Sequence, residues 1–154
     1  MAILVVGSVA LDDIQSPYGK VRASLGGSAT FFALSASYFT QVRIIAVVGE
    51  DFGKQHEDVF HKHGIDITGI EHAAGKTFHW SGEYGENPND CKLLDLQMNV
   101  FEKFQPKIPA SYRDSEYVFL GNINPELQSE VRNQMRGAKF VGLDSHPLDR
   151  KSVV

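Results

Sequence analysis

The run Ile3-Leu4-Val5-Val6, closed by Gly7-Ser8, decides the fold that this sequence predicts. A short stretch that is apolar on both faces and stops at a glycine is typical of a central strand in a parallel sheet, because such a strand is covered from both sides. The same pattern returns at residues 42–49, 117–121 and 139–144. We expect these stretches to be strands of one parallel sheet.

Helical segments separate the expected strands. Residues 28–39 are rich in Ala, Leu, Ser and Phe, residues 52–63 form a polar pattern that ends at Gly64, and residues 125–135 open with proline and close near Gly137. Strands that alternate with helices predict a three-layer α/β/α fold around a parallel sheet. The large side chains of the first helix are expected in the core: Phe31, Phe32, Tyr38 and Phe39.

Two segments do not follow this alternation. Residues 12–24 alternate in character around a Pro-Tyr-Gly turn, and residues 76–100 contain the strand-like pieces 77–82 and 92–96 on either side of a turn-rich stretch. We expect the two segments to form a small antiparallel sheet that projects from the main one. The chain has no internal repeat or linker, so residues 1–154 are taken as one unit.

The composition is that of an ordinary globular chain. Of its 154 residues 42% are apolar, and 15 basic against 19 acidic residues give a formal charge of −4. Without a basic stripe, nucleic acid is a poor candidate partner. The single cysteine, Cys91, cannot form an internal disulfide, which fits a reducing compartment. Because no apolar stretch approaches the roughly 20 residues of a membrane span and no basic leader opens the chain, we expect a cytoplasmic protein without a membrane partner.

Three features stand just after the expected strands, where open α/β sheets bind ligands. Asp12 follows the first strand, Gly26-Gly27-Ser28-Ala29-Thr30 opens a helix, and Gly49-Glu50-Asp51-Phe52-Gly53 follows the second strand. Paired glycines let a ligand approach the backbone, and a helix start offers free N–H donors. Taken alone, the glycines are equally well a tight turn and Asp12 a capping carboxylate. The chain has no Walker-type phosphate loop and no Gly-x-Gly-x-x-Gly fingerprint.

The order and spacing of these features resemble the N-terminal signature of the ribokinase-like (PfkB) carbohydrate kinases. The matching stretches are residues 5–12, 25–30, 47–53, 76–84 and 117–128. The resemblance implies a ribokinase-like α/β/α fold, of which residues 1–154 are the N-terminal portion of a single domain. It also implies that the projecting sheet, at about 12–24 and 76–100, is a lid that covers the substrate and mediates homodimerisation.

The resemblance assigns substrate-binding roles to individual residues. Asp12 matches the acidic residue that accepts hydrogen bonds from substrate hydroxyls, and Gly26 and Gly27 match the pair of glycines against which the sugar lies. Many relatives place Asn in the helix that follows. Here Thr30 or Phe31 stands at that place, depending on a one-residue ambiguity in alignment, and Thr30 could still offer a hydroxyl.

The implied activity is the ATP- and Mg²⁺-dependent phosphorylation of a sugar or nucleoside hydroxyl by the complete enzyme. Ala10 stands where ribokinases proper have Asn, which disfavours ribose and leaves a nucleoside or another polyol open. The family's C-terminal Gly-Ala-Gly-Asp stretch, which supplies the anion hole and the base, does not occur in this sequence.

From that departure we expect a truncated chain with no catalytic residue of its own, no activity alone and little affinity for ATP or Mg²⁺. Residues 145–154 no longer resemble the family. The alternative is a non-catalytic module on the same scaffold, which binds sugar or dimerises.

Other polar residues are predicted to be structural. The pair Glu50-Asp51 is expected to cap the helix that follows. His61 and His63 are two apart on a helix and therefore point to different faces, so no metal site is expected. Cys91 has no neighbouring base that would make it a nucleophile. Asp144, at a strand end, either faces the phosphates or is a simple turn residue.

Overall fold

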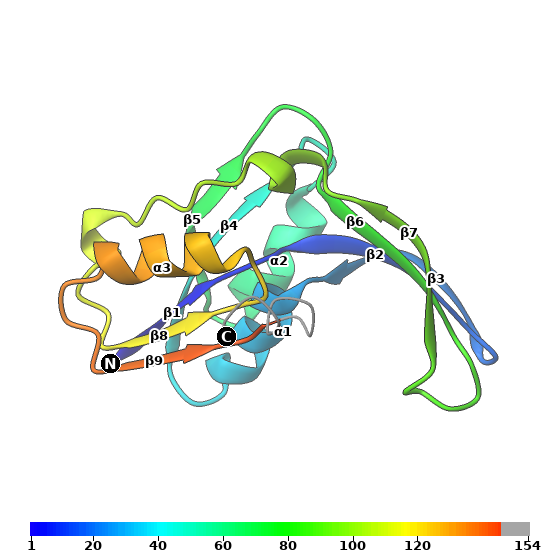
Figure 1. The fold of residues 1–154 in the computed structure, drawn as a ribbon, viewed down its shortest axis with the longest axis horizontal. Coiled ribbons are helices and arrows are strands. Elements are labelled where there is room, and N and C mark those ends of the chain that lie inside the picture. Colours follow the sequence, from blue (N-terminus) through cyan, green and yellow to red (C-terminus); the bar gives the residue numbers. More distant parts are fainter. Residues whose placement is uncertain (146–154) are drawn as a thin grey trace.

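A five-stranded sheet in the order β5-β4-β1-β8-β9 forms the main body of the protein (Figure 1). The computed structural model describes residues 1–145, so most of the segment that departs from the family pattern, residues 146–154, lies outside the described residues. The strands are β1 (Ala2–Val6), β4 (Gln41–Val48), β5 (Asp66–His72), β8 (Tyr117–Leu120) and β9 (Phe140–Leu143). All neighbouring pairs are parallel. The predicted parallel sheet is therefore confirmed.

Strand β5 was not predicted, because its sequence has no continuous apolar run. It lies at an edge of the sheet and pairs only with β4 among the described strands. Gly69 within it lies directly against its neighbour, since a Cβ at this position would lie 2.6 Å from the Ile44 carbonyl oxygen. Polar residues alternating around a glycine are typical of a half-covered edge strand.

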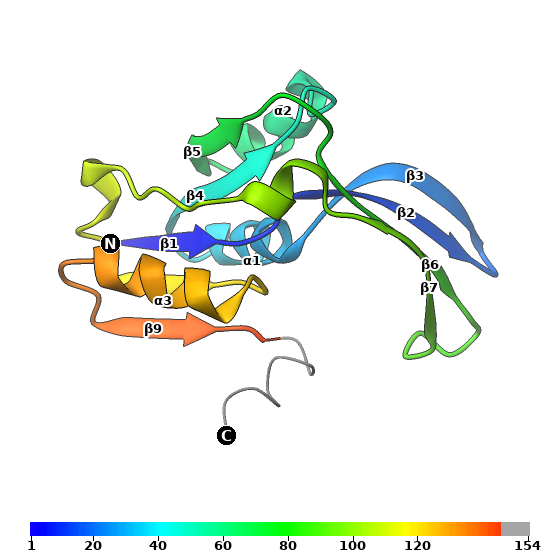
Figure 2. The ribbon, with the colours of Figure 1, turned by 45° about the horizontal axis from the view of Figure 1, so that its top comes forward.

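Helices cover both faces of the main sheet, which confirms the predicted three layers (Figures 1 and 2). On one face lie α1 (Ser28–Ser37) and α2 (Lys54–Lys62); on the other lie α3 (Pro125–Gln134) and the short 3₁₀ helices η1 (Asn99–Lys103) and η2 (Ala110–Tyr112). Successive residues of β4 alternate between the two cores, with Ile44 in one and Ile45 in the other. Among the described residues, no helix has both the length and the apolar character needed to cross a membrane.

The expected burial of the aromatic residues in and just after α1 is wrong for most of them. Three side chains are exposed: Phe31 (58%), Tyr38 (77%) and Phe39 (89%). Phe32 is half-buried and its ring stacks on Phe119, with the ring centroids 3.6 Å apart. The small residues Ala29 and Ala33 are instead fully buried in the core. Small side chains allow a helix to pack closely on a sheet, which leaves less room for aromatic rings.

A second sheet projects from the carboxyl end of the main one, in the order β3-β2-β6-β7 (Figure 2). Its strands are β2 (Ala10–Ser16), β3 (Gly19–Gly26), β6 (Phe78–Tyr84) and β7 (Cys91–Gln97). The expected all-antiparallel pairing is wrong, because the two hairpins join through a parallel β2–β6 pair. The reason is topological: β2 follows β1 and β6 follows β5, and both leave the parallel main sheet at its carboxyl edge. We call this the projecting sheet.

A hydrogen-bonded junction fixes the start of β6 to the loop after β4. The Asp51 Oδ1 accepts hydrogen bonds from the Thr77 backbone N–H at 2.7 Å and from its hydroxyl at 2.6 Å, and Thr77 Oγ1 accepts one from Gly49 N at 2.9 Å. Burial raises the pKa of Asp51, but the bonds from Thr77 outweigh it and hold this pKa below its ordinary value. Asp51 thus fastens the projecting sheet rather than capping α2, whose N-cap residue is Gly53.

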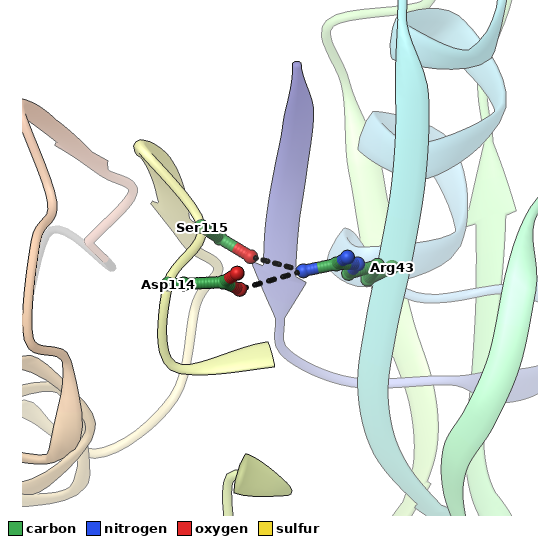
Figure 3. Close-up of polar contacts among 3 residues, drawn as sticks. All are labelled: Arg43, Asp114 and Ser115. Carbon is green, nitrogen blue, oxygen red and sulfur yellow. Dashed lines mark hydrogen bonds and ion pairs between the residues drawn. The ribbon is translucent and has the colours of Figure 1, made fainter. Parts of the chain in front are cut away.

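At the opposite end of the main sheet, Arg43 joins β4 to the segment before β8 (Figure 3). Its Nη1 lies 3.2 Å from Asp114 Oδ1 and donates to the buried Ser115 hydroxyl at 3.1 Å. The guanidinium carbon also lies 5.2 Å from the centroid of the Tyr112 ring. Asp114 is 80% exposed. The two polar contacts therefore differ sharply in solvent screening.

We predict that Arg43→Met lowers the free energy of unfolding by about 1–2 kcal/mol, because the buried Ser115 hydroxyl loses its donor. Asp114→Ala should change it by less than about 0.5 kcal/mol, since an exposed ion pair is screened by water. Urea unfolding followed by circular dichroism measures both. Equal losses in the two variants would show that the exposed contact matters as much as the buried one.

Candidate substrate-binding site

A cavity of about 670 Å³ lies between the carboxyl edge of the main sheet and the projecting sheet. Its walls come from the segments after β1 and β8, from the start of α1, and from β2, β6 and β7. A second hollow of about 780 Å³ lies at the tip of the projecting sheet, between the β2–β3 and β6–β7 turns. The first cavity has the position expected of an α/β ligand site, beyond the strand ends.

Asp12 lies in this cavity wall as part of β2. Its side chain is half-buried, and its Oδ1 atom is fully buried without a hydrogen-bond partner. Burial raises the pKa of Asp12 from 3.8 to about 6; nearby His79 works in the opposite direction and Asp13 adds to the rise. Buried acceptors are normally paired, so the unpaired oxygen makes Asp12 a candidate site residue.

The two glycines have different tasks. A Cβ on Gly26 would lie 2.5 Å from Asp12 Cγ and closer still to Oδ2, so the carboxylate rests on the Gly26 backbone. Gly26 is buried and does not line the cavity, whereas Gly27 does. Gly27 has φ 99° and ψ 152°, and a Cβ there would lie 2.7 Å from the Ser8 carbonyl carbon. Gly27 therefore requires glycine because of its backbone conformation and backbone contacts, whereas a side chain at Gly26 would displace the Asp12 carboxylate.

The structure separates Thr30 from Phe31. Thr30 is fully buried, its hydroxyl has no hydrogen-bond partner, and it is not part of the cavity wall. Phe31, one residue further along α1, lines the cavity. The resemblance aligned either Thr30 or Phe31 with an Asn of the relatives. Of these two residues, only Phe31 lines the cavity.

A pair of serines that the sequence analysis missed joins β1 to α1 beside Asp12. Ser28 N donates to Ser8 Oγ at 3.0 Å, and the two hydroxyl oxygens are 3.2 Å apart. Both side chains line the cavity. A Cβ on Gly121 would lie 2.6 Å from Ser28 Oγ, so the glycine that ends the β8 segment makes room for this hydroxyl. The available signal in the sequence was a serine directly after a glycine. Ser8 follows Gly7 at the end of a strand, and Ser28 follows Gly27 at the start of a helix.

Asn122 and Asn124, in the loop after β8, also line the cavity and were missed. Asn124 is the N-cap of α3, where its Oδ1 accepts from Glu126 N at 2.8 Å. No hydrogen bond joins the Asn122 side chain to another described residue, which leaves its amide available. Both follow an apolar strand run, the pattern that singled out Asp12.

Apart from Asp12 on β2, the projecting sheet and the segment after it supply mainly apolar and aromatic side chains to the cavity wall. They include Phe78, Trp80, Tyr84, Leu93, Leu96, Met98 and Phe101. The Phe78 and Phe101 rings stack with centroids 5.2 Å apart, which closes the end of this wall near η1.

The remaining sequence candidates lie elsewhere. Cys91 is exposed. Asp144 contributes its backbone: its N–H bonds the Leu120 oxygen at 2.8 Å, and its own carbonyl accepts from Gln128 Nε2 at 2.8 Å. Within residues 1–145, no three His, Cys, Asp or Glu side chains come together as metal ligands.

Comparison with known proteins finds nucleoside kinases as well as a ribokinase and a fructokinase. In sequence, the chain is 28% identical to a cytidine kinase of Thermococcus kodakarensis over 154 residues, which cover 99% of this chain and 54% of that protein. In structure, it resembles a nucleoside kinase of Methanocaldococcus jannaschii, described as an archaeal member of the ribokinase family, with a TM-score of 0.72, 18% identity and coverage of 93% of this chain and 52% of that one. It also resembles a Burkholderia thailandensis nucleoside kinase in complex with inosine, with a TM-score of 0.72, 12% identity and coverage of 86% and 47%.

The chain therefore spans about half the length of the relatives it matches. No protein-family model matches it. The ribokinase-like fold predicted from the sequence is confirmed.

We predict that Gly27→Ala destabilises the protein by more than about 2 kcal/mol, because this backbone region is open essentially to glycine alone and the methyl group would overlap Ser8. Gly64→Ala is the matched control: Gly64 also has a positive φ, 65°, but nothing lies within 4 Å of its Cβ position. It should cost about 1 kcal/mol. Thermal and urea unfolding compare the two, and an equal cost would refute the close contact.

We predict that Asp12→Asn stabilises the ligand-free protein at pH 8 but not at pH 4. The pKa of Asp12 is raised to about 6, so the folded state favours the protonated form. The stability this contributes is complete below the unfolded value of 3.8 and is lost as the pH rises through 6. Asn carries no charge and avoids this loss. At pH 8 the variant should therefore gain on the order of 1 kcal/mol in its free energy of unfolding, after solvent screening is allowed for. Calorimetric unfolding of both proteins between these pH values measures the difference, and a variant less stable at pH 8 would contradict it.

Proposed function

We propose that this chain, which has the ribokinase-like fold and whose sequence is similar over its whole length to that of a cytidine kinase, is the substrate-binding portion of an ATP-dependent kinase. The acceptor would be a hydroxyl group of a sugar or a nucleoside. The single observation that carries the proposal is Asp12, a half-buried carboxylate with an unpaired oxygen, set in the wall of a cavity at the strand ends. The names of the relatives, cytidine kinase and nucleoside kinase, support the same class of reaction.

Asp12 suits the binding of hydroxyl groups. With a pKa of about 6 it is largely ionised at pH 7, so it accepts hydrogen bonds as a charged group. Charge-assisted hydrogen bonds are the stronger kind, and a hydroxyl donor would also repay the lost hydration of the carboxylate. Gly27, Ser8 and Ser28 add a backbone surface and two hydroxyls beside it.

The projecting sheet would act as the lid of this site. Phosphoryl transfer competes with hydrolysis, so a cover that excludes water protects the phosphoryl group. In the complete enzyme, ATP would be the donor and Mg²⁺ would neutralise charge on the phosphates. The sequence contains no phosphate loop and no Gly-Ala-Gly-Asp stretch, so we assign neither the catalytic base nor a nucleotide-binding residue to this chain. We place the reaction in the cytoplasm.

A second candidate function is a non-catalytic module that binds sugar or dimerises through the projecting sheet. The observation that favours it is a set of exposed apolar side chains on that sheet which do not line the cavity: Tyr18 (90%), Val21 (55%) and Leu94 (48%). The outer strands β3 and β7 also each have one unpaired side in the described sheet. Exposed apolar groups and open strand edges favour association. Sedimentation of the chain with and without Leu94→Glu would test the dimer.

Binding is the first prediction of the kinase proposal. Titration calorimetry with a panel of sugars and nucleosides should identify at least one ligand, and Asp12→Asn should weaken it by about tenfold or more through the loss of a charged acceptor. Asp13→Asn is the matched control, because Asp13 lies beside a separate pocket on the other side of β2 and accepts a hydrogen bond from Ala23 N. Equal loss in both variants would argue against a site at Asp12.

Activity completes the same test. The chain mixed with the unmatched part of the Thermococcus kodakarensis cytidine kinase should release ADP from ATP when the bound ligand is present, and the chain alone should not. Binding that depends on Asp12 without any ADP release would favour the non-catalytic module.

A further inference from the structure

The His79 ring contacts the main chain directly before Asp12. His79 of β6 lies opposite Leu11 of β2, and its Nδ1 is 2.7 Å from the Leu11 carbonyl oxygen. That carbonyl belongs to the peptide group that joins Leu11 to Asp12. A carbonyl oxygen only accepts hydrogen bonds, so Nδ1 must carry a proton and donate it. The ring therefore holds the peptide group next to the Asp12 side chain.

His79 does this from the face of the projecting sheet that is turned away from the cavity. Successive side chains of a strand point to opposite faces of its sheet. Asp12 and Trp80 accordingly line the cavity of about 670 Å³, whereas Leu11 and His79 line a separate pocket of about 250 Å³. Because His79 is not part of the cavity wall, it can affect a ligand there only through Asp12.

The pairing of β2 with β3 is interrupted beside Asp12. The register shifts directly after this residue, so that Asp13 lies opposite two residues of β3, Arg22 and Ala23. Ala23 has φ 48°, a left-handed conformation of the kind that bulges use. A bulge disrupts the ladder of backbone hydrogen bonds and re-aims nearby side chains. The parallel pairing of β2 with β6 continues without a shift, so β6 is the neighbour that can fix the backbone at Asp12.

His79 is also close enough to Asp12 to act through its charge. Burial raises the pKa of Asp12 to about 6, and the positive charge that His79 carries when protonated works against this rise. Tyr84 is a titratable neighbour of Asp12 on the cavity face. The charged groups that share the pocket of His79 come from three elements: Asp13 from β2, Asp51 from the loop after β4 and Lys76 from the segment before β6. The hydrogen bond from Nδ1 is present in both protonation states of the ring and the charge in only one, so the two effects can be separated.

We infer that His79 is a positioning residue for Asp12: it fixes the Leu11–Asp12 peptide group from the far face of the projecting sheet and so aims the carboxylate into the cavity. The inference rests on the proposed function, because it gives His79 a task in binding at the same site. A hydrogen-bonded support behind a binding residue holds its geometry before the ligand arrives, which lowers the cost of binding.

The tautomer of His79 tests the contact in the unaltered protein without a ligand. Proton–nitrogen correlation spectra of the imidazole rings distinguish a proton on Nδ1 from one on Nε2. Once the ring is neutral, His79 should carry its proton on Nδ1, since the Leu11 carbonyl can only accept. A neutral ring that carries its proton on Nε2 could not donate to this carbonyl, and that result would overturn the inference.

Two variants separate position from charge. His79→Leu removes the donor and the charge, whereas His79→Asn keeps an N–H donor without the charge. Calorimetry at pH 8, where Asp12 is largely ionised, uses cytidine, inosine and fructose as probes. For a probe that binds, His79→Leu should weaken the affinity about fivefold through the loss of one hydrogen bond, and His79→Asn should stay within about twofold. His72→Leu is the matched control, because His72 lies on β5 and contacts Glu57; it should leave the affinity unchanged.

Nuclear magnetic resonance of the ligand-free proteins gives a readout that a merely structural role would not move. The Asp12 carboxyl should titrate at a higher pH in both His79 variants, because the charge that lowers its pKa is gone. The Asp12 backbone nitrogen, which senses the hydrogen bond to the preceding carbonyl, should shift in His79→Leu and return in His79→Asn. His72→Leu should change neither signal. If His79→Leu does not fold, the tautomer and His79→Asn still test the inference.

Failure of this inference and failure of the proposed function give different results. If a probe binds His79→Leu as tightly as the unaltered protein and Asp12 titrates unchanged, the inference fails while the proposed function stands. If both His79 variants lose the same affinity, the donor is not what supports Asp12, and the inference fails as well. If no sugar or nucleoside binds the unaltered chain, the proposed function fails, and the ligand-free spectra still show whether His79 positions Asp12.

Discussion

The absence of side chains at Gly26 and Gly27 is the constraint on which the site depends. A Cβ at the first would overlap the Asp12 carboxylate, and one at the second would overlap the Ser8 backbone. Because neither glycine carries a Cβ atom, the end of β3 and the start of α1 come close to the segment that leaves β1. This approach brings Asp12, Ser8 and Ser28 to one cavity and allows the two serines to bond across the junction.

The same close approach buries the Asp12 carboxylate and thereby disfavours its charged form. The carboxylate loses water without receiving a hydrogen-bond donor at Oδ1, and its pKa rises accordingly. Such a cost is consistent with the proposed binding role of Asp12, since a preformed site gives up stability to avoid reorganising when a ligand binds. Asp51 shows the contrast within one chain: two donors from Thr77 satisfy its carboxylate, its pKa falls, and its role is structural.

The sequence predicted most of the main sheet because buried parallel strands are continuous apolar runs. It failed for β5, whose half-covered edge position tolerates alternating polar residues. It also failed for the aromatic residues in and just after α1, since helical spacing does not reveal that Ala29 and Ala33 occupy the side packed in the core. In the site, Asp12 and Gly27 could be found from their strand- and helix-end positions. The wall formed by Trp80 could not, because it depends on the parallel β2–β6 register, which no local pattern encodes.

The junction of Asp51 with Thr77 has a mechanical consequence. The projecting sheet is joined to the body by the chain connections β1–β2, β3–α1, β5–β6 and β7–η1 and by this junction at the start of β6. Attachments at several points resist rotation of the sheet about any one of them. Asp12 and Trp80 lie in register on adjacent strands of this sheet, so a movement of the sheet would carry the two residues together. Opening would thus change the depth of the cavity while the spacing between carboxylate and indole stays the same.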